Sequence, residues 1–589
     1  MTRSTLRLLL ASVVAALALV VAACGGSDNG SSGSSSSGGG AANQETGQGK
    51  TGGVLRQLGS SDVDYLDPGH TYYTGGYQVA YVTQRPLYNF KPDQTDPVPD
   101  LAAGAPQISD DLKTVTVKIK PGVKFSPPVN RAVTSKDIKY AFERFFSVNV
   151  GGQYGTYFSS IKGVPKSPTK GVKPISGITT PDDQTIEFHL TRPEGVVISS
   201  ALVMPITMPV PEEYAKKFDA KNPSTYNTHV VATGPYMVKN DAQGNLTGYQ
   251  AGKSIDLVRN PNWDKSTDYK PAYLDEIQMT TNESDASIAA QQVLTGSHQA
   301  LDTNPPAAQL KDAVTNRKGQ FVQLPGGGYR YFPLNTTIKP LDNVNVRRAI
   351  VAAFDRDAAL KARGGKFTGD IPTHFLPPGL PGFEQAGGMA GPGFDFLKNP
   401  RGDMALATQY MKKAGFPSGK YTGNAKLLLV AANADPGKAQ AEVAKAQLEK
   451  LGFKITFRTV PQDAVYTEWC QVPKKQVAIC GSAGWFKDFT DPQSMLDPTF
   501  KGANIFKEGG NNNLAQLDVP AIDKAMDKAA TLQGDARLKA WADIDKQITA
   551  QAPAVPFDWD KTTIIWSKDV QGVGNPYFDA LDFAFTSLK

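Results

Sequence analysis

The side chains that most often carry enzymatic or metal chemistry are few in this chain and widely separated. Its 589 residues include five histidines, and no two of them have the spacing of metal ligands: His70, His189, His229, His298 and His374. The short motifs of serine hydrolases, zinc peptidases, phosphate-binding loops and dinucleotide-binding folds are all missing from the sequence. A pair of glycosidase carboxylates meets only in the fold, so that alternative stays open. We expect no metal site, no cofactor and no enzymatic activity.

Cysteine chemistry begins close to the start of the chain. Arg3 and Arg7 precede an apolar run over residues 8–21, and small residues then lead directly to Cys24. A basic, an apolar and a small-residue segment in this order form an export signal. Ala22-Ala23-Cys24 resembles the lipobox of bacterial lipoproteins, in which the cysteine receives a diacylglyceryl group and becomes the new N-terminus. This resemblance implies a lipoprotein signal peptide over residues 1–23 and a lipid on Cys24.

Two other fates of this segment compete with lipidation. Cleavage after the small residues could release a soluble secreted protein, or the apolar run could stay as an uncleaved anchor. The run is short for a bilayer span of about 20 residues, and no stop-transfer pattern follows it. We therefore expect a lipid-anchored protein on the extracytoplasmic face of the cell membrane.

The remaining two cysteines, Cys470 and Cys480, are close in sequence. In an oxidising compartment such a pair predicts a disulfide that closes a short loop around Pro473. A zinc site would need more ligands, and no histidine is near in sequence. We expect the disulfide to have a structural role.

Composition and charge exclude several classes of protein. The chain is 40% hydrophobic and 20% charged, which is typical of a globular protein large enough for several cores. Removal of Arg3 and Arg7 with the signal would lower the formal charge from +6 to +4, and no run of basic residues suggests nucleic acid. A stretch rich in Gly and Ser over residues 24–51 predicts a flexible tether with a reach of roughly 28 Å.

Strand and helix patterns alternate after this tether. Period-two alternation predicts a strand near 115–119, and strand-like runs predict further strands near 186–190, 255–258, 427–430, 455–457 and 562–566. Helical patterns cover 346–360, 439–451 and 537–550, and Thr134 to Asp137 reads as a helix start. These patterns predict a mixed α/β fold. Long Pro- and Gly-rich loops over 165–174 and 377–393 either line a functional site or decorate the surface.

Several phrases then occur in an order that resembles family 5 of the bacterial extracellular solute-binding proteins, the oligopeptide, dipeptide and nickel binders of ABC importers. The matching phrases are Gly52-Gly53-Val54-Leu55, Tyr65-Leu66-Asp67-Pro68, residues 112–125, Thr134-Ser135-Lys136-Asp137-Ile138, Thr233-Gly234-Pro235-Tyr236, Arg259-Asn260-Pro261-Asn262-Trp263, Leu334-Asn335-Thr336-Thr337 and Asn345-Val346-Arg347-Arg348-Ala349-Ile350. Ser126-Pro127-Pro128 departs from the family's usual Ser/His-Asp-Gly. We expect these phrases to have mostly structural uses, with Arg347 and Arg348 joining elements through ion pairs.

The resemblance implies a two-lobed, hinged periplasmic-binding-protein-like fold of type II. On this basis the N-terminal lobe covers 52–325, with an extra small domain near 96–178. The C-terminal lobe covers 326–552, and residues 553–589 return to complete the N-terminal lobe. A ligand that contacts both lobes would stabilise the closed form.

The resemblance also indicates a binding site in the segment from Gly484 to Pro492. Peptide-binding members carry Trp-x-x-Asp here, and its carboxylate pairs with the free α-amino group of the peptide. Carried over, that carboxylate belongs to Asp488, Trp485 forms an apolar wall, and Gly484 belongs to the same site. A buried ammonium needs a fixed carboxylate, since an unpaired buried ion costs several kcal/mol. The alternative is a helix-capping Asp488, or one paired with Lys487.

These expectations combine into one functional hypothesis. The chain is a monomeric, lipid-anchored subunit that captures short peptides or peptide-like solutes for an ABC permease and its ATPase. Nickel chelates, opines and oligosaccharides are alternative ligands. A surface sensor without a transporter and an exported hydrolase are alternative functions.

Overall fold

The computed structural model describes residues 48–59, 62–94, 96–283, 285–302, 304–481, 483–507 and 509–589. Every described residue belongs to one compact unit, Gly39–Lys589. The predicted signal peptide, the predicted lipid on Cys24 and nearly all of the predicted tether lie outside the described residues. No helix within the described ranges is long and apolar enough to cross a bilayer.

A mixed sheet, which we call the N-terminal sheet, forms from the first 301 residues. Its strand order is β12 (Ala300–Leu301), β1 (Val54–Leu58), β11 (Glu276–Thr280), β10 (Ser254–Arg259) and β8 (Tyr236–Val238), and β9 (Tyr249–Gln250) pairs with β10. Strand β1 runs parallel to both of its neighbours, and β10 runs antiparallel to β11 and β8. Ile255 and Leu257 alternate into the core, which confirms the strand predicted at 255–258.

An antiparallel sheet, the small sheet, lies next to helix α3 (Ser135–Phe145). Its order is β4 (Gln107–Ile108), β5 (Thr114–Lys118), β7 (Thr185–His189) and β6 (Ile178–Asp182). The strands predicted at 115–119 and 186–190 are therefore confirmed. The helix start is also confirmed: the Asp137 carboxylate accepts a hydrogen bond from the Thr134 N–H at 2.8 Å. Ile138, Phe142 and Phe145 point into a shared core with the small sheet.

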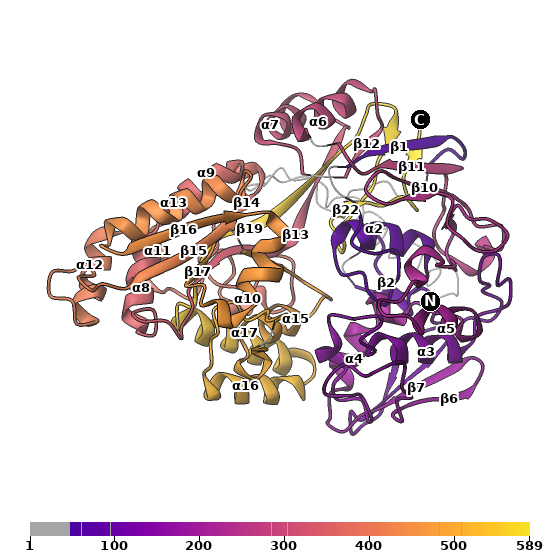
Figure 1. The fold of residues 1–589 in the computed structure, drawn as a ribbon, viewed down its shortest axis with the longest axis horizontal. Helices are drawn as coiled ribbons and strands as arrows, with labels where there is room; N and C mark the ends of the chain where they lie inside the picture. The colour runs from indigo at the N-terminus through magenta and orange to yellow at the C-terminus, as the bar shows by residue number, and fades with distance from the viewer. Residues whose placement is uncertain are drawn as a thin grey trace, which may run out of the picture. The chain divides into compact units, whose positions relative to one another are not determined.

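The central sheet is parallel and holds β16 (Lys454–Val460), β15 (Lys426–Ala432) and β17 (Ile479–Cys480). Helix α13 (Gly437–Lys450) connects β15 to β16, and α12 (Met404–Lys413) packs on α8 (Val344–Ala353) nearby (Figure 1). The single helix predicted at 346–360 is wrong, because α8 ends and α9 (Arg356–Arg363) begins anew. Asp355 caps α9 by accepting from Ala358 N–H at 2.8 Å, and the Arg356 N–H bonds to Pro400 instead of continuing the helix.

Two long antiparallel strands, β13 (Phe321–Pro333) and β19 (Ala554–Ile565), link the N-terminal and central sheets (Figure 1). They form the crossing sheet with β14 (Gly369–Asp370) and β18 (Ala483–Phe486), in the order β14-β19-β13-β18. Trp566, just after β19, bridges to Ala300 of the N-terminal sheet, and Leu334, just after β13, bridges to Ile479 of the central sheet. The backbone of the two strands is therefore continuous with both regions.

The remaining α-helices cover these sheets or lie at their ends: α2 (Thr74–Thr83), α4 (Gly195–Ala201), α5 (Glu212–Asp219), α6 (Ala286–Thr295), α7 (Ala307–Asn316), α10 (Phe383–Ala386), α11 (Asp395–Lys398), α14 (Gln462–Ala464), α15 (Gln493–Phe500), α16 (Pro520–Ala530) and α17 (Gly534–Ala550). Short strand pairs complete the fold: β2 (Tyr88–Asn89) with β3 (Val98–Pro99), β20 (Val570–Gln571) with β23 (Ser587–Leu588), and β21 (Gly574–Asn575) with β22 (Ala580–Leu581).

Within the described ranges, Arg347 and Arg348 do not make the ion pairs that we expected. Arg347 donates to the Gln551 carbonyl at 2.8 Å, and Arg348 donates to the Ala550 carbonyl at 2.7 Å. These carbonyls end helix α17, where the last C=O groups lack partners and carry partial negative charge. The two arginines thus join α8 to α17 through a helix C-terminus.

One of the family-like phrases has a clear structural use. Asp67, from the Leu-Asp-Pro turn, accepts two hydrogen bonds from the buried guanidinium of Arg144 at 2.7 Å each. Asp219 binds the same guanidinium from its other side. Since all three groups are buried and paired, they fix the turn to α3 and α5.

Candidate functional site

A cavity of about 950 Å³ lies between loops around the small sheet and segments from the central and crossing sheets. One wall holds Tyr72, Phe145, Phe146 and residues 164–168, so part of the predicted loop 165–174 lines it. The other wall holds Arg330, Tyr331, Tyr466, Gln471, Gly484, Trp485 and Phe486. The volume is large enough for a small-molecule ligand, and apolar surface with a few polar groups is typical of such sites. We call this cavity the cleft.

Asp488 stands two residues after the end of β18 and connects segments that are far apart in the chain. Its carboxylate accepts hydrogen bonds from the hydroxyls of Tyr72, at 3.1 Å, and Tyr157. The Tyr577 hydroxyl donates to the Asp488 backbone carbonyl at 2.7 Å. The next residue, Phe489, packs edge-on against Tyr157 at 4.9 Å between ring centroids. This short loop therefore anchors the crossing sheet to the N-terminal elements.

The environment of Asp488 is unfavourable for a free negative charge. The residue is only 8% exposed, and burial raises the pKa of its carboxyl to about 7, although the two tyrosine hydroxyls partly offset this. Within the described residues it has no basic partner. Lys487 donates to the Pro576 carbonyl at 2.7 Å, and within the described residues it does not pair with Asp488, so the alternative of a 487–488 ion pair is wrong. Asp488 itself does not line the cleft, but its partner Tyr72 does.

Asp491, and not Asp488, caps the start of a helix. It accepts from the Gln493 N–H at 2.8 Å at the start of α15, and it forms a buried ion pair with Arg537 at 2.8 Å. The helix-capping alternative therefore describes Asp491, and the carboxylate of Asp488 is left without a role in backbone capping.

Trp485 and Gly484 line the cleft on β18, as the resemblance implies. The Trp485 indole N–H donates to the Ser494 carbonyl at 2.8 Å, which fixes the half-buried ring against the cleft. The Gly484 N–H donates to the Tyr466 hydroxyl at 3.1 Å. A β-carbon on Gly484 would collide with Nη1 of Arg330, so this position needs glycine for close approach rather than for a special backbone angle.

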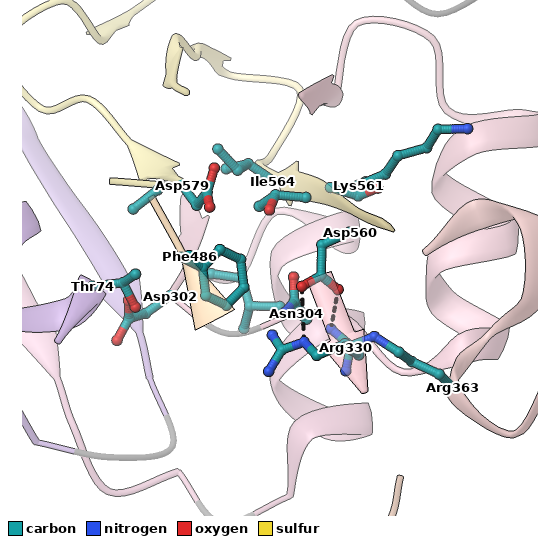
Figure 2. A pocket seen from close by; sticks show the side chains of 14 residues that line it. Thr74, Asp302, Asn304, Arg330, Arg363, Phe486, Asp560, Lys561, Ile564 and Asp579 are labelled. Carbon is teal, nitrogen blue, oxygen red and sulfur yellow. Dashed lines mark hydrogen bonds and ion pairs between the residues drawn. The ribbon is translucent and has the colours of Figure 1, made fainter. Parts of the chain in front are cut away.

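Charged residues that sequence reasoning missed line a smaller pocket of about 140 Å³ beside the cleft (Figure 2). Arg330 and Arg363 line both cavities. Asp560 accepts from Arg330 Nε at 2.8 Å and from Arg363 Nη2 at 3.0 Å, and Asp558 lies 3.0 Å from Arg363 Nε. No motif signals this group, because its members come from β13, α9 and β19 and meet only in the fold.

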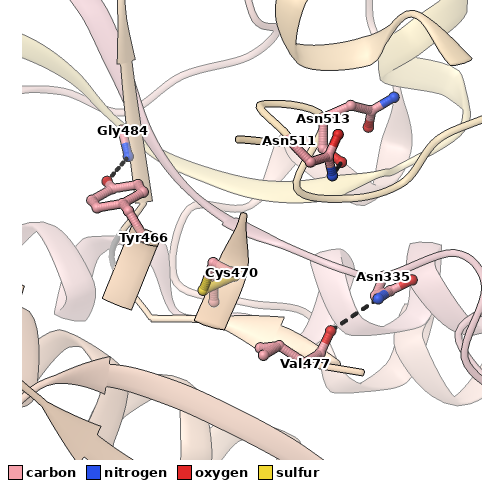
Figure 3. Close-up of a disulfide and its surroundings, with 8 residues drawn as sticks. Asn335, Tyr466, Cys470, Val477, Gly484, Asn511 and Asn513 are labelled. Carbon is pink, nitrogen blue, oxygen red and sulfur yellow. Dashed lines mark hydrogen bonds between the residues drawn. A yellow bond between two sulfur atoms is a disulfide. The ribbon is translucent and has the colours of Figure 1, made fainter. Parts of the chain in front are cut away.

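The predicted disulfide between Cys470 and Cys480 is present (Figure 3). It joins the end of the short helix Val465–Cys470 to the end of β17. That helix carries Tyr466, whose hydroxyl holds Gly484 at the cleft. The bridge thus ties together two segments of one cleft wall. Across the described ranges, no three His, Cys, Asp or Glu side chains gather in a way that could hold a metal ion.

Comparison with known proteins agrees with this geometry. Residues 96–507 match the family described as "Bacterial extracellular solute-binding proteins, family 5 Middle". The heme-binding protein A of Haemophilus influenzae is 26% identical over 485 residues, covering 80% of each chain. The dipeptide-binding protein of Pseudomonas aeruginosa is 26% identical over 512 residues, covering 82% of this chain and 85% of the relative.

A solved structure extends the likeness to the fold. "Clavulanic acid biosynthesis oligopeptide binding protein 2" superposes with a TM-score of 0.79 at 26% identity, over 92% of this chain and 96% of that one. The predicted periplasmic-binding-protein fold is therefore confirmed, whereas the lobe boundaries stay predictions.

Proposed function

The chain belongs to family 5 of the bacterial extracellular solute-binding proteins, and from this premise we propose that it captures short peptides for an ABC importer. Members of this family are non-catalytic substrate-binding subunits, so the exported hydrolase drops out as an alternative. The choice of peptides is supported by relatives that are named dipeptide- and oligopeptide-binding proteins. The ligand occupies the cleft, and a membrane permease with its ATPase receives it.

The observation that carries this proposal is the buried carboxylate of Asp488. It lies beside the cleft, bonded to cleft-lining Tyr72, and no basic side chain of the described residues neutralises it. A peptide α-ammonium supplies the missing positive charge and forms charge-assisted hydrogen bonds. Trp485 then packs against the first residues of the peptide, and the wide cleft leaves room for different peptide side chains.

Binding is proposed to require closure of two lobes about a hinge. The N-terminal lobe is residues 52–325 with the return segment 553–589, and the C-terminal lobe is residues 326–552. The long strands β13 and β19 cross between them. Tyr72 and Tyr157 reach Asp488 from the N-terminal lobe, so the amine site has contributions from both lobes. A ligand held there favours the closed form by its differential affinity.

Lipid anchoring belongs to the same proposal. A lipid on Cys24 and a tether over residues 24–51 keep the protein near the permease, which raises its effective concentration there. A Cys24→Ser variant should appear in the extracytoplasmic fluid instead of the membrane fraction. Equal membrane association of both forms would contradict the anchor without touching the ligand proposal.

Two measurements test the ligand class. Native mass spectrometry of protein purified without refolding identifies the solute that occupies the cleft, and peptides are expected. In a thermal-shift screen with tri- to pentapeptides, a ligand at one hundred times its Kd should stabilise the fold by about 2.7 kcal/mol. Hemin, nickel chelates, opines and oligosaccharides serve as the competing ligands. Stabilisation by one of these and by no peptide would overturn the proposal.

A transport role and a sensor role are separated by a different test. Genes for a permease and an ATPase beside this gene, and loss of peptide uptake when it is deleted, support transport. Peptide binding without any change in uptake on deletion favours the sensor.

A further inference from the structure

The end of the central sheet at which β15 and β16 begin has a strongly basic surface. Residues 412–454 hold eight lysines against three acidic residues, a net charge of +5 in a chain whose formal total is +6. Six of these lysines are exposed, and we call them the lysine patch: Lys412, Lys413, Lys420, Lys426, Lys450 and Lys454. Nearly all of the formal net charge is therefore concentrated in one segment of the chain.

The starts of two strands form the middle of the lysine patch. Lys426 and Lys454 are the first residues of β15 and β16, which lie side by side, and they are partners in the parallel ladder (Figure 1). The Lys454 Nζ donates to Asn424 Oδ1 at 3.1 Å, so it stays beside the chain that leads into β15. Two positive charges thus occupy one end of the sheet.

Tyr421 holds the loop between α12 and β15 against the same end. Its N–H donates to the Leu451 carbonyl at 2.8 Å, which brings Lys420 and Lys450 to one surface. Phe416, just past the end of α12, packs against the Tyr421 ring at 5.3 Å between centroids. The two lysines that end α12 therefore belong to this surface as well.

The folded protein does not neutralise the lysine patch. Within the described residues none of its six members forms an ion pair, whereas Lys445 nearby pairs with Glu449 at 2.8 Å. Neighbouring strands are about 4.8 Å apart, so the like charges of Lys426 and Lys454 repel each other. Positive charge is favourable in the last turns of α12 and α13, but the three patch lysines outside these helices have no helix end to stabilise.

The composition of the lysine patch fits a lipid surface better than a protein partner. No large apolar side chain is exposed over residues 412–454, whereas the core of a protein interface is rich in aromatic and apolar groups and poor in lysine. Anionic phospholipid headgroups attract lysines on flexible stems without demanding a fixed geometry. We propose that the lysine patch binds the surface of a membrane that contains anionic phospholipids.

This contact goes beyond peptide capture and gives the lysine patch a role in orientation. A tether alone leaves the folded body free to turn above the membrane, whereas a second, electrostatic contact at one end of the central sheet limits its orientation. The inference uses the proposed lipid on Cys24 only to explain why the membrane is near. Vesicle binding therefore tests the lysine patch with the lipid removed.

Co-sedimentation with vesicles measures this binding for the full chain carrying Cys24→Ser, purified from the extracytoplasmic fluid. One set of vesicles is phosphatidylcholine alone, and the other contains about one-third phosphatidylglycerol. The protein should bind the anionic vesicles at least tenfold more tightly. This binding should fall at least tenfold between 0.1 M and 1 M salt, because the screening length shortens from about 10 Å to about 3 Å.

Two triple variants separate the lysine patch from the net charge of the protein. The patch variant leaves the helix ends intact and carries Lys420→Gln, Lys426→Gln and Lys454→Gln. Each lysine near an anionic surface is worth about fivefold in affinity, so this variant should bind the anionic vesicles at least tenfold more weakly. The control variant replaces exposed lysines of other elements and carries Lys113→Gln, Lys124→Gln and Lys253→Gln. It should bind within about twofold of the unsubstituted lysines, and both variants should keep the same melting temperature.

Several results would overturn the lipid contact. Equal binding to both kinds of vesicle would do so, and so would an equal loss of binding in the two triple variants. If the patch variant loses binding only to phosphatidylcholine vesicles that carry the permease, the lysine patch serves that protein instead of the lipid. Peptide affinity of the patch variant, measured by calorimetry, should match that of the wild type, so failure of the lipid contact leaves the peptide proposal untouched.

Discussion

Peptide affinity should depend on pH through Asp488. Burial raises the pKa of this carboxyl to about 7 in the ligand-free protein. An ammonium pairs with the ionised carboxylate, so binding lowers that pKa and must displace the proton. Peptide affinity therefore rises as pH increases toward and through 7, and it falls as pH decreases below 7.

The magnitude follows from the fraction of ionised Asp488. At pH 7 about half of the carboxyl groups are ionised, and at pH 5 only about 1% are. Affinity should therefore fall roughly 50-fold between pH 7 and pH 5, which corresponds to about 2.3 kcal/mol. The peptide amine has a pKa near 8 and stays mostly protonated over this range, so it changes the ratio little.

Calorimetry at pH 5, 6 and 7 measures both the affinity and the proton balance. In two buffers with different ionisation enthalpies, binding at pH 7 should release somewhat less than half a proton per peptide. Asp488→Asn cannot release that proton, so its weaker binding should be nearly independent of pH. Asp110→Asn, at an exposed position away from the cleft, should retain the full pH dependence.

Two other carboxyl groups beside the cleft could also cause a pH dependence, so the Asp488→Asn variant is needed to tell them apart from Asp488. Burial raises the pKa of Asp302 to about 6 and that of Asp579 to about 8, and both residues line the smaller pocket. If Asp488→Asn retains the wild-type pH dependence, one of these groups is responsible and our reasoning about Asp488 is refuted. A wild-type affinity that does not change from pH 7 to pH 5 refutes it as well.

Three further predictions concern stability and positioning. The pKa of Asp488 in the folded protein lies above its usual value near 3.8, so this group lowers the stability of the fold as pH rises from about 4 to 7. Asp488→Asn should therefore raise the free energy of unfolding in urea by up to about 4 kcal/mol at pH 7 and by little at pH 4. Equal effects at both pH values would contradict this. Replacing Cys470 and Cys480 by serine should lower the free energy of unfolding by at most about 3 kcal/mol relative to the oxidised protein, as measured by denaturant titration. An unchanged unfolding midpoint would show that the disulfide does not stabilise the fold. Gly484→Ala should push its new β-carbon against Arg330 in the cleft wall and weaken peptide binding about tenfold, while leaving the effect of N-acetylation intact. Unchanged affinity, measured by calorimetry, would mean that the arginine moves without consequence.

Local signals in the sequence predict local structure well. The helix start at Thr134 depends on a side chain three residues away, and the alternating strands depend on burial of every second residue. The helix break at Asp355 is different, because the Arg356 N–H finds its partner in Pro400, which no local pattern specifies. Arg347 likewise binds the end of a helix that closes 200 residues later.

The candidate site likewise contains residues that a local sequence phrase indicates and residues that only the fold brings there. Trp485 and Asp488 lie within one short phrase, so a family resemblance can point to them. The hydroxyls that hold Asp488 come from Tyr72 and Tyr157, more than 300 residues earlier. Arg330 depends on Asp560, 230 residues later. Such groups have no sequence signature, because they meet through contacts between distant segments of the fold rather than through spacing along the chain.

Asp488 is proposed to bind the α-amino group of a peptide. The most direct test of this role is the ratio of Kd values for an N-acetylated peptide and the same peptide with a free amine, measured on wild-type protein and on Asp488→Asn. We predict a ratio of about ten to one hundred for the wild type and close to one for the variant, since acetylation leaves a buried carboxylate without its cation. Equal affinity of the wild-type protein for both peptides would contradict the account.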